Sequence, residues 1–317
     1  MIILPILDLN PSVIVQLWNE TLGEKFPMSE ALWNQNTVDE SNVLNKASIA
    51  YIEGNELLGF VVAKQYQELN EAVMASHIGW IQCLVVKKSA RNQGIGTYLL
   101  RHVEEAFREF KLTETRLGRD PWHYFPGIPL EDNRTIEWFE KRGYSKESIE
   151  TDLTKEVNDQ PLYTLTNSPE HFRVLTKDDL PSLLKFLEKS FPGRWHYEAI
   201  HYIINNGSGR DFMGFFHDNE LQGFCRINDP QSPVIAQNVY WSELFEGELG
   251  GIGPLGINRS IRGNNFGLDL VKAAANELIS RDVSHIVIDW TQLVPFYEKL
   301  GFTTWKQYQT MAKLISY

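Results

Sequence analysis

A six-residue segment, Arg91-Asn-Gln-Gly-Ile-Gly96, has the residue types and the spacing of an anion-binding loop. It follows the apolar run 78–86 and precedes a stretch whose apolar residues recur every three or four positions, which predicts a strand, a loop and a helix. The first N–H groups of a helix lack internal acceptors, and the helix dipole favours an anion there. Glycine at 94 and 96 permits close backbone approach or positive φ, and Arg91 can add a charged contact. The loop suits a pyrophosphate, although a glycine-rich helix start can also be a plain turn.

The same pattern occurs twice in the chain. The segment Arg262–Gly267 (RGNNFG) stands 171 residues after Arg91–Gly96 (RNQGIG). A second landmark, Trp138–Tyr144 (WFEKRGY), is matched by Phe296–Phe302 (FYEKLGF) 158 residues later. Two landmarks in the same order predict a duplicated domain, and 317 residues are enough for two domains of ordinary size.

Each copy predicts a similar series of elements. In the first we expect a hairpin over 47–64, strands over 78–86 and 115–118, a helix from about 95, and a helix over 136–141 that ends at Gly143. In the second we expect strands over 212–216, 221–227, 249–257 and 285–289 and a helix over about 267–280. Residues 157–170 are rich in polar and helix-breaking types. We therefore expect domains over 1–156 and 171–317, joined by a linker over 157–170.

Composition narrows the classes of partner. The formal net charge is -11, and no Lys/Arg cluster reverses it locally, which argues against nucleic acid and weakly favours cationic amines or basic peptides. The two cysteines, Cys83 and Cys225, stand far apart in apolar stretches, which suits small buried side chains in a reduced cytoplasmic protein. The sequence shows no signal peptide and no apolar run near the roughly 18 residues of a membrane span. We expect a cytoplasmic protein without a membrane partner, and the sequence does not indicate its oligomeric state.

Together the two landmarks resemble those of the GCN5-related N-acetyltransferases. In that family a strand ending in Val or Ile is followed by Q/R-x-x-G-x-G/A, and a later helix places an aromatic residue four positions before Gly-Phe/Tyr. The resemblance covers most of each half. It implies an α/β fold of two tandem domains, each a mixed, mostly antiparallel sheet flanked by helices. It also implies acetyl-CoA as cosubstrate, no metal, and transfer of an acetyl group to a primary amine by direct attack.

The resemblance also implies which residues of this chain contact the ligand. In the family the strand meets pantetheine and the loop amides hold the pyrophosphate of coenzyme A. The corresponding residues of the first copy are Leu84, Val85, Val86, Arg91, Asn92, Gln93, Gly94, Ile95, Gly96 and Thr97. Those of the second copy are Ile257, Arg262, Gly263, Asn265 and Gly267.

The two copies depart from the family pattern in different ways. The first keeps both loop glycines but has Phe139 where the family often has a tyrosine that protonates the departing thiolate. The second has Tyr297 there, but Asn265 replaces the first loop glycine; asparagine tolerates positive φ better than other non-glycine residues. Tyr297 is therefore the candidate general acid, with an aromatic core residue as the alternative.

Two polar residues at strand starts are candidates for the base. Glu248 begins the strand of the second copy, and His77 has the corresponding place in the first. Each can equally be a solvated strand-end residue. Two aromatic segments, 121–129 and 191–195, either shape an acceptor pocket or pack on themselves.

The sequence thus predicts an N-acetyltransferase whose acceptor is a small molecule or a peptide. Two alternatives stay open. The chain could be a non-catalytic acyl-CoA-binding or sensing protein, or its first domain could be structural, with the chemistry only in the second.

Overall fold

The computed structural model describes all residues, 1–317, and its internal contacts divide the chain into two units. Unit 1 contains residues 1–69, 75–150 and 306–317. Unit 2 contains residues 70–74 and 151–305. Each unit is a mixed α/β domain, as the sequence predicts.

The sheet of unit 1 has the strand order β1-β2-β3-β4-β5-β13. Its strands are β1 (Ile2–Pro5), β2 (Ile49–Glu53), β3 (Glu56–Gln65), β4 (Ile78–Val86), β5 (Glu114–Leu117) and β13 (Thr303–Leu314), with the short β6 (Ile128–Pro129) paired to β13. All of these pairings are antiparallel except β4 with β5. The parallel pair places the ends of β4 and β5 at one edge of the sheet.

Helices cover both faces of this sheet. They are α1 (Pro11–Leu22), α2 (Glu30–Trp33), α3 (Ile95–Glu109) and α4 (Asn133–Glu140). On one face the apolar side of α3 and residues of α4 pack against β3, where Val61 is fully buried. On the other face Trp33 of α2 meets Phe60 of β3 edge to face. The alternation of Phe60 and Val61 between the two faces is the period-two pattern of a strand buried on both sides.

Unit 2 repeats this arrangement with the strand order β7-β12-β11-β10-β9-β8. Its strands are β7 (Ser145–Glu156), β12 (His285–Thr291), β11 (Leu249–Ile257), β10 (Glu220–Asn228), β9 (Phe212–His217) and β8 (Phe172–Val174). Its helices are α5 (Leu180–Ser190), α6 (Arg194–Ile204), α7 (Phe266–Ser280) and α8 (Val294–Glu298). Of the adjacent strand pairs in unit 2, only β11 and β12 run parallel.

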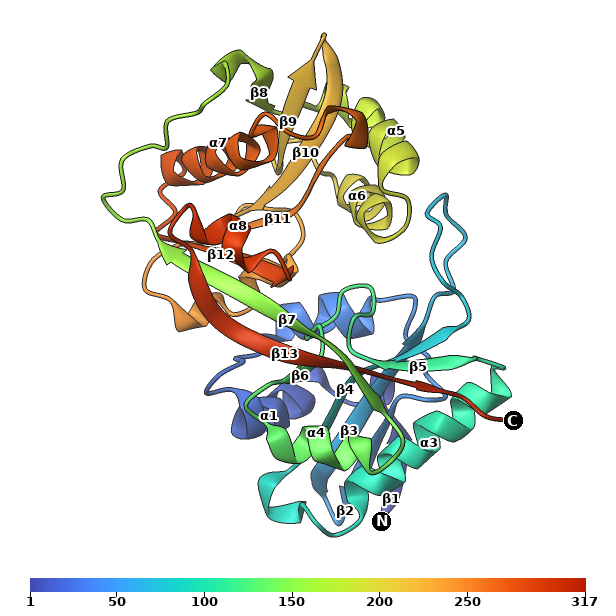
Figure 1. Cartoon of the computed structure of the whole chain (residues 1–317). Helices are drawn as coiled ribbons and strands as arrows, with labels where there is room; N and C mark the ends of the chain where they lie inside the picture. Colours follow the sequence, from blue (N-terminus) through green and yellow to red (C-terminus); the bar gives the residue numbers. More distant parts are fainter. The chain divides into compact units, whose positions relative to one another are not determined.

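The last strand of each copy pairs in the other unit. The strand β7 follows α4 of unit 1, but its residues 151–156 pair with β12 of unit 2. The strand β13 follows α8 of unit 2, but its residues 312–314 pair with β5 of unit 1, which brings the C-terminus beside that strand (Figure 1). The contact units therefore differ from a division of the sequence at 156 and 171.

Residues 157–170, the expected linker, lie within unit 2 and are bonded along α7. The backbone N–H of Tyr163 donates to the Asn276 side chain over 2.7 Å, and the N–H groups of Thr166 and Asn167 donate to the buried Asp269 carboxylate. Hydrogen bonds to a buried charged group are among the stronger ones in proteins. This segment is therefore a strap held on a helix.

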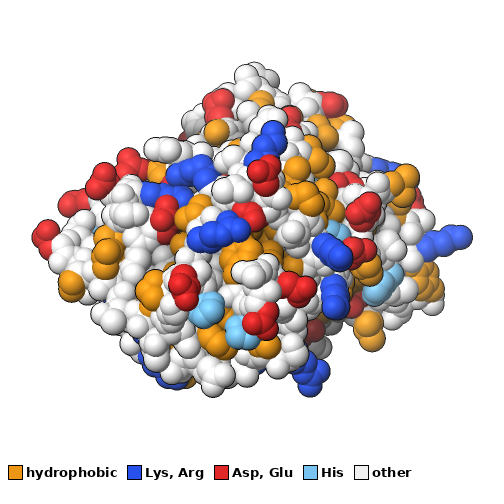
Figure 2. Space-filling view, turned by 90° about the horizontal axis from the view of Figure 1, so that it is seen from above, with side chains coloured by type: hydrophobic (Ala, Val, Ile, Leu, Met, Phe, Trp, Pro, Cys, Tyr) orange, Lys and Arg blue, Asp and Glu red, His pale blue; other side chains and the backbone are white.

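The surface and the helices add two further observations. On the face shown in Figure 2, basic and acidic side chains are interspersed with hydrophobic ones. None of the helices combines the length and the apolar character that a bilayer crossing requires.

Candidate functional site

In unit 1 the predicted loop connects β4 to α3 and ends at a left-handed residue. Gly94 caps α3 with φ +87°, and a side chain at this position would meet no atom within 4 Å. The helix is anchored behind it because Ile95 and Leu99 are buried in the core of unit 1. The N–H groups of the first helical turn have no acceptors inside the helix, so they are available to an anion in front of the loop.

The strands β4 and β5 separate beside this loop. Their parallel pairing runs from Ile78 opposite Glu114 to Ile81 opposite Leu117 and then ends. Residues 83–86 continue as part of β4, so one edge of their backbone has lost its strand partner. A diverging strand pair presents peptide groups to an extended ligand in the way a sheet edge does.

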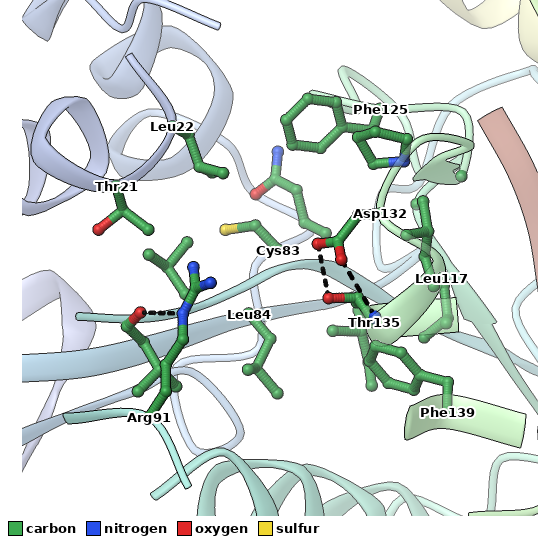
Figure 3. Close-up of a pocket in the computed structure, with 18 residues that line it drawn as sticks. Thr21, Leu22, Cys83, Leu84, Arg91, Leu117, Phe125, Asp132, Thr135 and Phe139 are labelled. Carbon is green, nitrogen blue, oxygen red and sulfur yellow. Dashed lines mark hydrogen bonds between the residues drawn. The ribbon is translucent and has the colours of Figure 1, made fainter. Parts of the chain in front are cut away.

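A pocket of about 150 Å³ lies at this separation. Residues of β4, the loop, the end of β5 and α4 form its walls, and Thr21 and Leu22 at the C-terminal end of α1 complete the lining (Figure 3). Both Leu84 and Phe139 contribute to the apolar part of the lining. The predicted pantetheine strand and the predicted aromatic position of unit 1 therefore meet at one cavity.

The titratable groups that line this pocket are already engaged or neutral. Burial raises the pKa of the Cys83 thiol far above its usual range, so it stays protonated. The Asp132 carboxylate caps α4 by accepting from the N–H and the hydroxyl of Thr135. Arg91 donates its Nε–H to the carbonyl of Val86 over 3.3 Å. The pocket of unit 1 can hold a ligand, but it offers no free base.

The aromatic segment 121–129 is packed mainly by other aromatic side chains. The Trp18 ring meets Tyr124 edge to face and stacks with Phe125. The Tyr124 hydroxyl lies 2.9 Å from that of Thr37, and both residues are buried. Only part of the segment, including Phe125 and Pro129, reaches the pocket wall. The segment is thus largely core, with one edge at the cavity.

In unit 2 the corresponding loop has nearly the same backbone. Asn265 caps α7 with φ +60°, a left-handed conformation like that of Gly94. Arg262 donates its Nε–H to the carbonyl of Ile257 over 3.1 Å, as Arg91 does to Val86. The asparagine therefore reproduces the helix start rather than disrupting it, as its tolerance of positive φ predicts.

The strands of unit 2 also separate, but different side chains stand at the separation. The parallel pairing of β11 with β12 ends at Gly251 opposite Val287. Asp289 lies two residues further along β12. The side chain of Asn238 spans the gap, because its Nδ2 donates both to the carbonyl of Gly253 on β11 and to Oδ1 of Asp289, over 3.3 and 3.1 Å.

Two groups at this separation have strongly shifted acidities. Burial, reinforced by the nearby carboxylates of Asp152 and Glu198, raises the pKa of Asp289 from 3.8 to about 7, while Arg194 opposes the shift. Tyr297 is 6% exposed, and burial raises its pKa far above the usual value, with smaller contributions from Cys225 and Asp289. A carboxylate that titrates near neutrality thus lies close enough to a neutral phenol to affect its pKa.

Comparison with known proteins identifies the family. Residues 14–125 and 180–302 match the model of the acetyltransferase (GNAT) family, which covers more than half of the chain. The chain belongs to the GNAT acetyltransferase family. No curated protein matches it in sequence.

Solved structures of GNAT proteins share the fold of the whole chain. A GCN5-related glucosamine N-acetyltransferase region of a fungal multi-domain GH3 β-N-acetylglucosaminidase is 21% identical, with a TM-score of 0.84 over 96% of this chain. The chain spans 37% of the length of that fungal protein. A GCN5-related N-acetyltransferase from Sphaerobacter thermophilus is 15% identical, with a TM-score of 0.70, 100% coverage of this chain and 96% of its own. A tandem GNAT protein from the clavulanic acid biosynthesis pathway is 13% identical, with a TM-score of 0.69 and coverages of 100% and 99%.

The structure brings the candidate acid of this GNAT chain to the strand separation but not the candidate base. Tyr297 lies on α8 within the core of unit 2. Glu248 is exposed immediately before β11, five residues before Gly253, and its carbonyl accepts from Ser284. His77 is likewise exposed immediately before β4. Because a strand rises about 3.3 Å per residue, Glu248 lies roughly 16 Å from Gly253, where Asn238 spans the gap.

Sequence reasoning missed Asp289 and Asn238. Asp289 belongs to a strand that the apolar pattern did predict, and the 171-residue offset between the copies matches it to Gly118. A carboxylate that replaces a glycine at the end of a parallel strand was the available signal. Asn238 had none, because it lies in a short 3-10 turn (Gln237–Val239) far from both landmarks in sequence.

Proposed function

We propose that the chain is an acetyl-CoA-dependent N-acetyltransferase that transfers the acetyl group to a primary amine by direct attack within a ternary complex. The observation that carries this proposal is the geometry common to the two units. In each, a strand leaves its parallel neighbour and runs into a left-handed helix start. This arrangement suits a ligand with an extended amide-bearing arm and a pyrophosphate.

The loop contacts expected from the family fit these backbones. In unit 1 the pyrophosphate would meet residues 91–97, and the pantetheine arm would lie along Leu84 to Val86 at the pocket. In unit 2 the equivalent groups are Ile257 and the loop residues Arg262, Gly263, Asn265 and Gly267. A Cβ at Gly96 would lie 3.6 Å from Trp138 and one at Gly267 would lie 3.9 Å from Phe296, which are ordinary contact distances, so packing within the chain does not by itself require glycine at either position.

The acceptor that we propose is a small cationic amine or a peptide amine. The overall charge of -11 and the carboxylates around Asp289 favour a cation over an anion. The fungal structure is described as a glucosamine N-acetyltransferase region. An amino sugar is therefore a sensible first member of an acceptor panel.

Calorimetry and a turnover assay test the proposal together. Acetyl-CoA should bind, with up to two sites per chain, and thiol release should depend on an added amine. A panel of amino sugars, polyamines, amino acids and basic peptides covers the chemistry. Failure of acetyl-CoA to bind the folded chain would contradict the assignment outright.

A second role is favoured for unit 1 by the contents of its pocket. Phe139 stands where unit 2 has Tyr297, and the carboxylate in the lining already caps a helix. Unit 1 would then bind acetyl-CoA without using it, as a sensing or structural partner. Acetyl-CoA binding without any turnover by the whole chain would extend this role to both units.

A further inference from the structure

We propose that acyl transfer takes place in unit 2 and that Asp289 is the general base that removes a proton from the acceptor ammonium. This inference rests on the proposed function, and it assigns the two units different tasks. It depends on the position of Asp289, on the groups that hold it, and on the absence of an equivalent group in unit 1.

The position of Asp289 is defined by the two parallel strand pairs. Trp80 lies opposite Arg116 in unit 1, and Gly251 lies opposite Val287 in unit 2, so the same 171-residue offset holds on both strands. Gly118 comes two residues after Arg116, and Asp289 comes two residues after Val287. The following residues, Arg119 and Trp290, both have positive φ, at +65° and +45°, although Gly118 itself is left-handed (φ +64°) and Asp289 still belongs to β12.

Gly118 lines the pocket of unit 1, and Asp289 has the corresponding register position beside the strand separation of unit 2. The ideal Cβ at Gly118 would lie 2.1 Å from the carbonyl oxygen of Phe125, which leaves no room for a side chain in unit 1. Unit 2 has a carboxylate at this place. The same register position thus carries a carboxylate in unit 2 and has no room for a side chain in unit 1.

Asn238 fixes the direction of this carboxylate. Its amide is buried, donates to Oδ1 of Asp289 and also donates to the carbonyl of Gly253 across the gap. Its own Oδ1 accepts from Asn228 over 3.1 Å, which sets the orientation of the amide. The only other donor to this carboxylate is the backbone N–H of Asp289 itself, and the residue stays partly accessible. Asn238 is therefore a positioning residue, and Oδ2 is the atom left for a ligand.

Three elements around Asp289 contribute charged or titratable groups. Asp152 comes from β7, Glu198 and Arg194 from α6, and Tyr297 from α8. Arg194 is largely neutralised by Glu198, to which it donates over 2.8 Å. The summed charge of Asp152, Glu198 and Arg194 is negative, which attracts an ammonium ion. Burial, reinforced by Asp152 and Glu198, raises the pKa of Asp289 to about 7, so that the carboxylate can accept a proton near neutral pH.

Asp289 and Tyr297 account for every proton that moves during acyl transfer. The acceptor ammonium gives one proton to Oδ2 of Asp289, and the freed nitrogen lone pair forms the new C–N bond at the thioester carbonyl. The C–S bond breaks, and its electron pair takes the phenolic proton of Tyr297. The resulting phenolate recovers a proton from the nitrogen as the amide forms. Asp289 then returns its proton to solvent, so one proton is released for each amide formed.

The phenol of Tyr297 is free for this part. Its hydroxyl makes no hydrogen bond within the chain, although the residue is almost fully buried. The hydroxyl oxygen is not among the fully buried polar atoms that lack a partner, so it remains accessible and can donate to a ligand. A carboxylate base and a phenol acid with widely separated acidities are the pairing that acid–base catalysis requires.

Removing the charge of Asp289 tests the assignment. With Asp289→Asn the value of kcat/KM should fall by about 100-fold or more, while the affinity for acetyl-CoA stays unchanged. The unaltered enzyme should lose activity tenfold per pH unit below about pH 7, and the variant should lack this limb. Asp282→Asn removes the same charge at an exposed turn before the same strand and should behave like the unaltered enzyme.

A second variant separates a chemical role from a structural one. Asp289→Gly introduces the residue that unit 1 has at this place, and added formate should restore part of its rate because formate supplies an external carboxylate. Retention of activity within about threefold in both variants would overturn the proposal. So would persistence of the acidic limb in Asp289→Asn, or a loss confined to Glu248→Gln.

The same assay distinguishes failure of the base from failure of the function. If turnover survives in the Asp289 variants, Asp289 is not the base, but the chain is still an acetyltransferase. If the unaltered chain binds acetyl-CoA but turns over no amine, both the assignment of the base and the proposed function are wrong.

Discussion

The two units keep the same left-handed helix start beside the strand separation and have different side chains at the separation itself. Gly94 and Asn265 both adopt positive φ at the helix start, and Arg91 and Arg262 both bond the last carbonyl of the preceding strand. The candidate acid–base groups are not shared in this way, because unit 1 has Gly118 and Phe139 where unit 2 has Asp289 and Tyr297. The comparison teaches that the ligand-binding conformation and the reactive groups of a duplicated domain can be retained separately. Loop glycines alone identify a binding site and not the place of reaction.

Cutting the chain at the boundary expected from sequence should have the largest effect. A fragment of residues 1–156 lacks the last residues of β13, including Met311, which is fully buried in the core of unit 1. A fragment of residues 157–317 lacks Leu153, which is fully buried in the core of unit 2. Loss of one such side chain costs roughly 2–5 kcal/mol, and each fragment also leaves a strand unpaired. Neither fragment should show a cooperative thermal transition by circular dichroism.

Co-expression of the two fragments is the control for that experiment, because it supplies every strand and should restore a folded complex. A cooperative melt of either fragment alone, close to that of the full chain, would show that the exchanged strands are dispensable.

Removal of the Tyr297 hydroxyl should have the next largest effect. Loss of a general acid lowers kcat by roughly 100-fold or more, with acetyl-CoA affinity nearly unchanged. Tyr317→Phe is a matched control, because that hydroxyl donates to the carbonyl of Leu112 in unit 1. An unaltered kcat in Tyr297→Phe would make Tyr297 an aromatic core residue and would remove the main difference between the units.

The stability of Asp289→Asn should depend on pH. The folded chain holds the Asp289 proton up to about pH 7, whereas the unfolded chain releases it near its ordinary pKa of 3.8. The free energy of unfolding therefore falls as the pH rises from about 4 to 7, and the asparagine variant escapes this loss. Thermal melts should show the variant more stable by roughly 1–3 kcal/mol at pH 8 and equal at pH 4. Equal stability at both values would mean that the charge is well solvated.

The smallest effect is expected where the loops differ in sequence but not in conformation. Asn265→Gly gives unit 2 the residue of unit 1, and both types accept φ near +60°. Acetyl-CoA affinity and stability should change by less than about 1 kcal/mol, measured by calorimetry and thermal melting. A tenfold gain in affinity would instead show that asparagine impairs the loop of unit 2.

Much of each copy follows from local sequence. The apolar run 78–86 and the run 249–257 are strands with those bounds, and the helices after both loops begin within a residue of the expected position. Such elements are predictable because strand runs, helical periodicity and left-handed helix starts are short-range signals. The acetyltransferase family follows from the same landmarks.

The exchange of last strands could not be predicted in this way. Residues 145–156 and 303–314 follow equivalent glycines, Gly143 and Gly301, and have equal lengths. Nothing local indicates which sheet each strand joins, because pairing is decided by contacts distant in sequence. The base that we propose was not predicted for a related reason. Glu248 was judged by its place at a strand start, whereas the strand separation that selects Asp289 is visible only in the pairing register.

Turnover of two loop variants tests the division of tasks most directly. Valine cannot readily adopt the left-handed backbone of either helix start, and at Gly94 it would meet no neighbouring atom, so the fold should survive. With saturating amine, Asn265→Val should lose at least about 90% of the turnover. Gly94→Val should keep kcat within about twofold while calorimetry shows one acetyl-CoA site fewer. Loss of turnover in Gly94→Val, with full activity in Asn265→Val, would contradict the account by placing the chemistry in unit 1.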